Sequence, residues 1–317
     1  MSTPLKIGVI GSGSLALEAM RFVQRSTEHF SLEGFYSTSE GDLRSFMNEF
    51  GMMPFHHAES LIECVDAVVI ACEGSSVYEF SRLALRSLKH VFVFGPPTLQ
   101  SDQARELLKV IREARLIGHV YNPLFLSEEW QFCATRKVQP EFMEYRRVMP
   151  SIQGVTHPML LHAIDAMHLV LSATDANARR VSANGIIRAG TASLCNARIE
   201  LDNGAVADIA LTSSGQENKQ IIDVHFSSGS MSIDLIQHRI TEEILDSNAQ
   251  WKVRDWDFSH QNLIGSAMME WKHDIELKPH LGVTWHQATR ALELALQVID
   301  KLNSHVLLQD PDVYLEP

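Results

Sequence analysis

The chain has 317 residues, of which 45% are hydrophobic, and a formal net charge of −12. A chain of this length is more than one hydrophobic core usually serves, so we expect two domains. The acidic balance argues against a partner that needs a basic face, such as nucleic acid or an anionic membrane, and no apolar run approaches the roughly 20 residues that span a bilayer.

The first predicted elements, within residues 5–25, are a strand, a tight glycine turn and a helix in immediate succession. Gly11, Gly13 and Ala16 form the pattern G-x-G-x-x-A, in which the first glycine turns the chain, the second lets backbone approach a pyrophosphate, and the small third residue lets helix pack on strand. The helix N-terminus offers N–H groups and a partial positive charge to that diphosphate. The predicted dinucleotide contacts are Gly11, Ser12, Gly13, Ser14 and Leu15. The alternative is a strand-to-helix turn that binds no ligand.

The second predicted parallel strand has Ser37 and Thr38 at its carboxyl end. In an NAD site, an acidic residue about 20 residues beyond the glycine loop binds the ribose hydroxyls. Here that place is hydroxylic, and Ser37, Thr38 and Arg44 together favour a 2′-phosphate, so we predict NADP, with NAD possible. The alternative is that the Ser-Thr-Ser segment only forms a turn and that Glu40 or Asp42 binds the ribose.

Strands and helices continue to alternate along the rest of the first half. Asp66 to Cys72 (DAVVIAC) is its most strand-like segment, and the strand Val91 to Phe94 must end at the Gly-Pro-Pro that follows. The other expected elements are a short strand at Met53 to His57, helices at Asp42 to Phe50, Tyr78 to Leu88 and Ser101 to Ala114, and a strand at Leu116 to Val120. This alternation predicts an α/β fold with a doubly wound parallel sheet of the Rossmann type over residues 1–122.

The second half contains a helix followed by strands that pair antiparallel. The helical pattern covers Pro158 to Leu171, and from Ala197 onward apolar residues recur at every second position. Asn203-Gly204 between two such alternating runs indicates a hairpin. A last helix is expected at about 284–303. We therefore predict an α+β substrate and oligomerisation domain over residues 123–317 with a large open, mainly antiparallel sheet.

Roughly the first 125 residues resemble one oxidoreductase family in their motifs and spacing. The matching phrases are KIGVIGSGSLA, the DAVVIAC strand, an AL-x-x-x-KHV join from helix to strand, a proline soon after that strand, and YNP at the end of the first half. They are similar to those of the glucose-fructose oxidoreductase, inositol dehydrogenase and MocA (Gfo/Idh/MocA) family, which is nicotinamide-dependent. The resemblance implies a Rossmann domain and then an α+β domain whose open sheet often serves as a subunit interface. It also implies that Cys72, Glu73, Gly95 and Pro96 lie beside the cofactor.

The residues expected to carry the chemistry depart from that family. Its motif after the KHV strand is Glu-Lys-Pro, with a lysine assigned to acid–base work and substrate positioning, but this chain has Gly95 in that place. In the second domain the family carries an aspartate where this chain has Pro158. His162 and Asp165 of the same family motif are kept. A glycine cannot transfer a proton, so the lysine's role must pass to another group.

His162 is the best remaining acid–base candidate, because an imidazole titrates nearest neutral pH and its matched position in the family faces the nicotinamide. Asp165 lies one helical turn on and could orient it. The alternative is that these are ordinary packed residues of a helix. We predict no metal, although His157 and His168 could join these two residues around an ion.

Two classes of function remain open. The first is an NAD(P)-dependent oxidoreductase that acts on a hydroxyl, carbonyl or imine of a small polar substrate, sugar-like or cyclitol-like, with the cofactor supplying the hydride chemistry. The alternative is a catalytically inactive nucleotide-binding protein that acts as a sensor or structural partner. The four cysteines have no C-x-x-C spacing, which predicts reduced thiols and a cytoplasmic location. The exposed sheet predicts a homo-oligomer, a dimer or tetramer.

Overall fold

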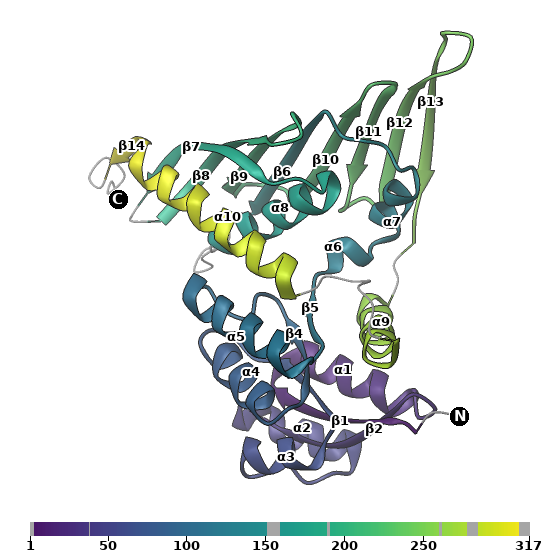
Figure 1. Cartoon of the computed structure of the whole chain (residues 1–317), viewed down its shortest axis with the longest axis vertical. Coiled ribbons are helices and arrows are strands. Elements are labelled where there is room, and N and C mark those ends of the chain that lie inside the picture. Colours follow the sequence, from purple (N-terminus) through teal and green to yellow (C-terminus); the bar gives the residue numbers. More distant parts are fainter. Residues whose placement is uncertain are drawn as a thin grey trace. The chain divides into compact units, whose positions relative to one another are not determined.

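The structure, a computed structural model, describes residues 3–37, 39–150, 159–188, 191–259, 262–277 and 285–310. The chain forms two compact units (Figure 1). Unit 1 consists of residues 1–126 and 262–289, and unit 2 of residues 127–261 and 290–317. Each unit has a sheet of its own, one parallel and one mainly antiparallel, so the predicted fold class is confirmed.

Unit 1 is built on a five-stranded sheet in the order β2-β1-β3-β4-β5. The strands are β1 (Leu5–Gly11), β2 (Phe30–Tyr36), β3 (Ala67–Ala71), β4 (His90–Phe94) and β5 (Gly118–Tyr121). Neighbouring strands all pair in parallel. Every residue of β3 is buried, as a strand covered on both faces requires. The strand order changes direction between β1 and β3, and open α/β sheets bind ligands at the carboxyl ends of the strands at such a switch point.

Helices cover both faces of this sheet. α1 (Gly13–Arg25) buries the apolar stripe that its sequence predicts, namely Ala16, Ala19, Met20 and Val23. It shares one core with α2 (Glu40–Phe50) and α9 (Leu263–Leu277). On the other face lie α3 (Ala58–Cys64), α4 (Ser76–Arg86) and α5 (Ser101–Ala114). There, Gly8 of β1 lies against Leu61 of α3.

The short strand expected at Met53 to His57 does not form. The segment instead runs beside β2 as irregular chain, with a hydrogen bond from Phe55 N to Phe35 O of 2.9 Å. The Phe55 ring packs over the bare backbone of Gly34. Because the Phe55 ring packs on Gly34, the segment is held beside β2 without the continuous backbone hydrogen bonds of a paired strand. The next strand along the chain is β3.

The core of unit 1 includes a helix that comes late in the sequence. The α9 residues in this core are Ile264, Ala267, Met268 and Trp271. The Trp271 ring lies 5.4 Å from the ring of Phe92 in β4. The division predicted from sequence put all of 123–317 in the second domain, whereas the compact units assign 262–289 to unit 1. An apolar helix face can pack on either core, so its partner is decided by tertiary structure.

Unit 2 is built on a nine-stranded sheet in the order β13-β12-β11-β10-β6-β9-β8-β7-β14. The strands are β6 (Phe142–Pro150), β7 (Ala178–Arg188), β8 (Thr191–Leu201), β9 (Val206–Gly215), β10 (Lys219–Phe226), β11 (Gly229–Asp234), β12 (Arg239–Leu245), β13 (Trp251–Asp257) and β14 (Val306–Asp310). Two pairings are parallel, β6 with β9 and β14 with β7, and the others are antiparallel. The predicted hairpin joins β8 and β9, and Gly204 has the positive φ, 90°, that its turn needs.

Helices cover one face of the unit 2 sheet (Figure 1). α8 (Met159–Thr174) packs on β6, β8 and β9. In α10 (Trp285–Ser304), Leu302 lies against Gly185 of β7. Along β9, the residues that face the helices are Ala207, Ile209 and Leu211, which are buried, and those on the opposite face are Asp208, Ala210 and Thr212, which are partly exposed. This period-two alternation is the one that the sequence shows. The remaining helices are α6 (Pro123–Leu126) of unit 1 and α7 (Glu128–Thr135) of unit 2.

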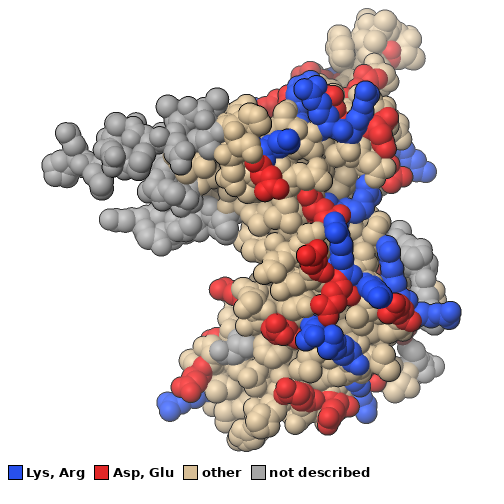
Figure 2. Space-filling view, turned by 60° about the vertical axis from the view of Figure 1, so that its left-hand side comes forward, with Lys and Arg blue, Asp and Glu red and all other residues tan. Residues whose placement is uncertain are grey.

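The surface carries charges of both signs. On the face drawn in Figure 2, Lys and Arg side chains are interspersed with Asp and Glu. Such mixing is typical of a solvated surface. In the part of the chain that the structure describes, no helix is long and apolar enough to cross a membrane.

Candidate dinucleotide site and active site

The glycine loop at the end of β1 has a backbone that requires its first glycine. Gly11 has a φ of 148°, and a Cβ on it would lie 2.1 Å from the backbone oxygen of Ala71 in β3. The next amide, Ser12 N, donates a hydrogen bond to the same Ala71 oxygen at 3.1 Å. The loop is thereby held between the ends of β1 and β3, at the switch point of the sheet.

The second glycine opens the helix that a diphosphate would approach. Gly13 has a φ of 76°, and no atom lies within 4 Å of the place where its Cβ would be. The space beside the Gly13 backbone is therefore open, as the close approach of a ligand to that backbone requires. Its N–H donates to Asp42 Oδ2 at 2.9 Å. The carboxylate of α2 thus lies directly on the loop.

The structure describes two of the three residues predicted to contact a 2′-phosphate at the end of β2. The Ser37 hydroxyl donates to Ser39 O at 2.7 Å and accepts from Ser39 N at 3.2 Å, so it closes a local turn. Thr38 lies outside the described residues. Arg44 is exposed on α2. The structure supports the turn that was the alternative for Ser37, and the preference for NADP stays a prediction.

The end of β3 carries two further predicted contacts. Cys72 is buried, with its Sγ 3.5 Å from Ile10 O of β1. Glu73 is exposed, and Gly74, with a φ of 64°, turns the chain toward α4. Both predicted residues thus lie at the same sheet edge as the glycine loop.

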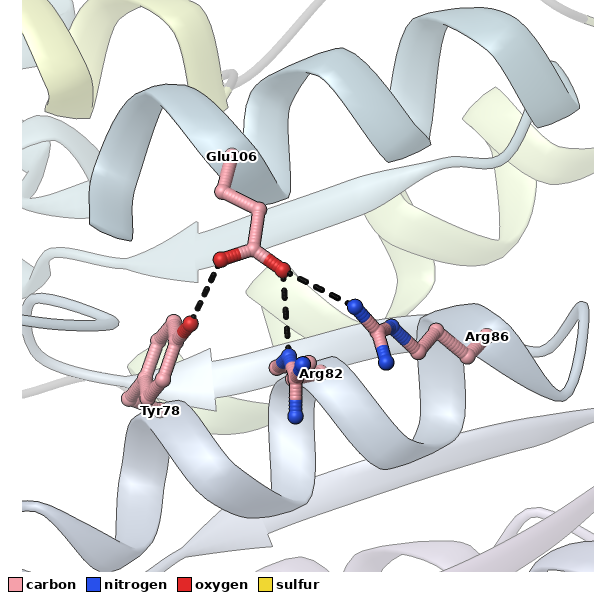
Figure 3. Close-up of polar contacts among 4 residues, drawn as sticks. All are labelled: Tyr78, Arg82, Arg86 and Glu106. Carbon is pink, nitrogen blue, oxygen red and sulfur yellow. Dashed lines mark hydrogen bonds and ion pairs between the residues drawn. The ribbon is translucent and has the colours of Figure 1, made fainter. Parts of the chain in front are cut away.

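A shared carboxylate braces α4, which begins just after this loop, against α5 (Figure 3). Tyr78 donates to Glu106 Oε2 at 2.7 Å, and Arg82 and Arg86 donate to Oε1 at 3.0 and 3.2 Å. The hydrogen bond from Tyr78, followed by that from Arg82, lowers the pKa of the Glu106 carboxyl. The brace therefore keeps its charge at neutral pH and fixes the helix that holds the Cys72–Gly74 loop.

The end of β4 carries a glycine whose backbone conformation disfavours a lysine. Gly95 has a φ of 82°, in the left-handed region that favours glycine, and its missing Cβ would meet nothing within 4 Å. A lysine there would be strained by conformation rather than by collision. Gly95 and Pro96 are half-buried. The carboxyl ends of β1, β3 and β4 therefore bring the predicted loop residues to one edge of unit 1.

The two predicted catalytic residues lie on α8 of unit 2. His162 and Asp165 are both half-buried, and His168 on the same helix is buried. Burial raises the pKa of Asp165 to about 7, against a smaller lowering by Arg147. Burial also lowers the pKa of His168 to about 4, which keeps that ring neutral. His157 and Pro158 lie outside the described residues, and among the described ones no group of three acidic, His or Cys side chains is arranged to hold a metal.

A polar cluster lies on the helix-covered side of the unit 2 sheet; we call it the α8 cluster, made of Tyr145, Arg147, Asp165 and Gln220. Gln220 Nε2 of β10 donates to Tyr145 Oη of β6 at 3.1 Å. Burial, followed by the Asp165 charge, raises the pKa of Tyr145 above its usual value. Arg147 donates to Asn218 Oδ1 at 2.5 Å and to Lys219 O at 3.2 Å. The cluster joins a carboxyl that titrates near neutral pH to a cation and a neutral phenol.

Residues 5–122 match the family model GFO_IDH_MocA, described as an oxidoreductase family with an NAD-binding Rossmann fold. The part of the chain that forms the parallel sheet thus matches the Gfo/Idh/MocA oxidoreductases. The matched residues run from β1 to the end of β5 and contain the whole glycine-loop edge. The predicted family resemblance is confirmed, and with it an NAD(P)-binding Rossmann domain.

Several solved structures share the fold along nearly the whole chain. A UDP-N-acetylglucosamine 3-dehydrogenase from Acidithiobacillus ferrooxidans is 23% identical over 243 residues, 74% of this chain and 76% of that protein. A solved structure of this enzyme, GnnA, is 20% identical with a TM-score of 0.86, covering 95% of this chain and 98% of that one. Biliverdin reductase from Synechocystis sp. PCC 6803, in complex with biliverdin and NADP+, is 18% identical with a TM-score of 0.78, covering 95% and 100%. Scyllo-inositol dehydrogenase from Lactobacillus casei, with bound NAD(H) and scyllo-inositol, is 15% identical with a TM-score of 0.78, covering 95% and 97%.

Sequence reasoning singled out the glycine loop and the two α8 residues but not the neighbours of Asp165. Alternation along β6 puts Tyr145 and Arg147 on one face, and this pattern is a signal that the sequence carries. The strand that supplies Gln220 could not be identified, because β10 follows β9 in sequence but pairs with β6. That non-local pairing creates the cluster.

Proposed function

We propose that the protein is an NAD(P)-dependent oxidoreductase that acts on a hydroxyl, carbonyl or imine of a small polar substrate of the sugar or cyclitol type. The observation that carries this proposal is the glycine loop, where Gly11 fits against Ala71 O and Gly13 leaves open space at a helix N-terminus. The site therefore fits a dinucleotide, which supplies the hydride chemistry when bound. The names of the relatives, two of them dehydrogenases of a sugar nucleotide and a cyclitol, support the substrate class.

Proton transfer is the step that the missing lysine leaves open. Oxidation of an alcohol to a carbonyl would also release the O–H proton to a base, and the reverse reduction would take that proton back. Asp165, with a pKa of about 7, has both protonation states populated near neutral pH. His162, one turn earlier on α8, is the second candidate. We assign the proton-transfer role to Asp165, with His162 as its neighbour in the site.

A catalytically inactive nucleotide-binding protein is the second candidate function. Gly95 and Pro158 stand where the family resemblance implies a lysine and an aspartate, and the left-handed φ of Gly95 is a conformation that disfavours a lysine. The two functions differ in one outcome. An inactive protein binds the coenzyme but turns over no sugar, cyclitol or cyclic imine, whereas the enzyme turns over at least one of them.

The open face of the unit 2 sheet supports a proposed homo-oligomer. This face carries a groove of about 410 Å³ lined mostly by polar residues, among them Arg198 and Asp208, which pair at 2.9 and 3.0 Å. Satisfied charge pairs on an open sheet are compatible with contact to a second copy. Light scattering at micromolar concentration is expected to give a multiple of 35.6 kDa. A mass of one chain would remove this part of the proposal.

Coenzyme binding by Gly13→Val tests the dinucleotide site directly. The valine side chain would project into the space that a diphosphate must enter, so we expect affinity for NADH and NADPH to fall by at least about tenfold. Gly51→Val is the matched control, because Gly51 also has a positive φ, 65°, and open space around its missing Cβ, but it ends α2 away from the loop. Fluorescence titration of both variants gives the comparison. Equal binding by wild type and Gly13→Val would show that the assignment is wrong.

A further inference from the structure

The carboxylate of Asp42 is held on the glycine loop by a backbone hydrogen bond. Asp42 lies in the first turn of α2 and is half-buried, and its Oδ2 accepts from Gly13 N at 2.9 Å. Gly13 is the residue at which α1 begins. A side chain 29 positions further along the chain is therefore oriented by the same backbone that would approach a dinucleotide.

A carboxylate in this position suits a ribose diol. An ionised carboxylate has about four acceptor positions on its two oxygens, and the Gly13 N–H takes one of them. The rest can accept from vicinal hydroxyls, which is how an acidic residue recognises the adenosine ribose of NAD in Rossmann sites. Such charge-assisted hydrogen bonds are stronger than neutral ones.

The charges around this position oppose a 2′-phosphate. Glu40 and Asp42 both lie in the first turn of α2, so two carboxylates stand at the end of the helix that an anion would otherwise favour. Arg44 follows Asp42 by two positions, and side chains so spaced point to different sides of a helix. Since Asp42 points at Gly13, Arg44, which is exposed, lies on a different side of α2 from the contact with the loop.

The Ser37 hydroxyl, which was predicted to bind the 2′-phosphate, makes a local hydrogen bond instead. The Ser37 O–H donates to Ser39 O, and a phosphate would have to break that hydrogen bond to receive one. We propose that Asp42 is the specificity residue of the coenzyme site, and that it makes the protein select NAD(H) over NADP(H). The inference rests on the proposed function of the glycine loop and reverses the preference predicted from the sequence.

Titration of NADH and NADPH against three variants tests the proposal without any substrate. Wild type is expected to bind NADH at least about tenfold more tightly, the effect of a charge-assisted hydrogen bond together with repulsion of the 2′-phosphate. Asp42→Asn keeps an oxygen that can accept from Gly13 N–H and removes the charge, so the ratio of the two dissociation constants should fall to within about threefold. Glu40→Gln removes the exposed acid of the same turn and should change the ratio less than Asp42→Asn does. Arg44→Gln should leave NADPH binding unchanged.

The outcomes separate this inference from the proposed function. If wild type binds neither coenzyme, the proposed function itself fails. If wild type binds both and Asp42→Asn leaves their ratio unchanged, only the role of Asp42 fails. Tighter NADPH binding by wild type, lost in Arg44→Gln, would overturn the inference and restore the preference predicted from Ser37, Thr38 and Arg44.

Discussion

The glycine-loop edge of unit 1 and the α8 cluster of unit 2 have departed from their family to different degrees. At the loop, Gly11 and Gly13 have positive φ values and surroundings that suit a dinucleotide. The residues expected to move a proton have changed, with Gly95 and Pro158 in place of a lysine and an aspartate. The glycines that suit coenzyme binding are thus kept, whereas the lysine and aspartate that the family resemblance implies are absent. Asp165, with a pKa of about 7, is the group best suited to have taken over.

Among the variants proposed to test this comparison, Asp165→Asn is expected to have the largest effect, a loss of turnover. Removing a positioned acid or base costs about 10² to 10⁴ in rate, while coenzyme affinity should stay near the wild-type value. Because the carboxylate form accepts the proton, wild-type oxidation should rise with pH through about 7 and reduction should fall. The pH–rate profile of Asp165→Asn should lack this inflection. Wild-type turnover by the variant would favour His162 or the inactive-protein alternative.

The pH dependence of stability gives a control that needs no substrate. The folded pKa of Asp165, about 7, lies above its ordinary 3.8. Between those two values the folded state keeps a proton that the unfolded state releases, so this group's contribution to stability declines as pH rises and levels off above about 7. Tyr145, Arg147 and His162 face the same region and are left in place. The melting temperature of Asp165→Asn, relative to wild type, should therefore be higher at pH 8 than at pH 5.

Gly11→Ala should have an intermediate effect, on stability as well as binding. Its Cβ would lie 2.1 Å from the Ala71 backbone oxygen, and overpacking of this kind typically costs about 1–3 kcal/mol. The control is Gly41→Ala, where the nearest atom is Ser39 Oγ at 3.6 Å and the site is helical, so stability should stay the same or rise by up to about 1 kcal/mol. Thermal unfolding measures both. An unchanged melting temperature for Gly11→Ala would contradict the tight β1–β3 junction.

Glu106→Gln should have the smallest effect, because its partners Arg82 and Arg86 are partly exposed. Loss of the ionised brace is expected to lower stability only slightly, because solvent screens these charges. Glu113→Gln is the matched control on α5, since Glu113 forms only an exposed pair with Lys109 at 3.8 Å. Chemical denaturation should therefore show a larger loss for Glu106→Gln. Equal losses would mean that the convergence of three donors on Glu106 adds nothing.

Local patterns predicted most of the fold of unit 1 and the strands of unit 2. The glycine loop, the α1 stripe and the Asn203-Gly204 hairpin each depend on residues close together in sequence, which is why they could be recognised. The pairing of β6 with both β9 and β10 joins segments far apart in the chain, and no local signal encodes it. The strand expected at Met53 to His57 was wrong, because packing of Phe55 over Gly34 replaced a ladder.

The candidate site likewise has parts that local sequence predicts and parts that depend on contacts between distant residues. The backbone contacts of the loop follow from glycine positions, whereas the role of Asp42 depends on a hydrogen bond across 29 residues. The sequence raised Asp42 as an alternative to the hydroxyl pair Ser37 and Thr38 but could not choose between them. The choice depends on which way the Asp42 side chain points from its helix, and distance along the chain does not give that direction. Asp165 was identified by its motif. Its titration near neutral pH follows from burial that only the tertiary structure supplies.

The late position of α9 has a consequence for synthesis of the chain. Unit 1 buries Trp271 against Phe92, so a nascent chain that has released only residues 1–126 exposes the part of one sheet face, at β4 and β5, that α9 covers. About 135 residues of unit 2, including eight strands, must leave the ribosome before α9 can close that face. The nucleotide-binding unit therefore matures after most of the unit inserted into it, and a fragment cut after residue 126 should need a chaperone or a supplied α9 peptide to stay in solution.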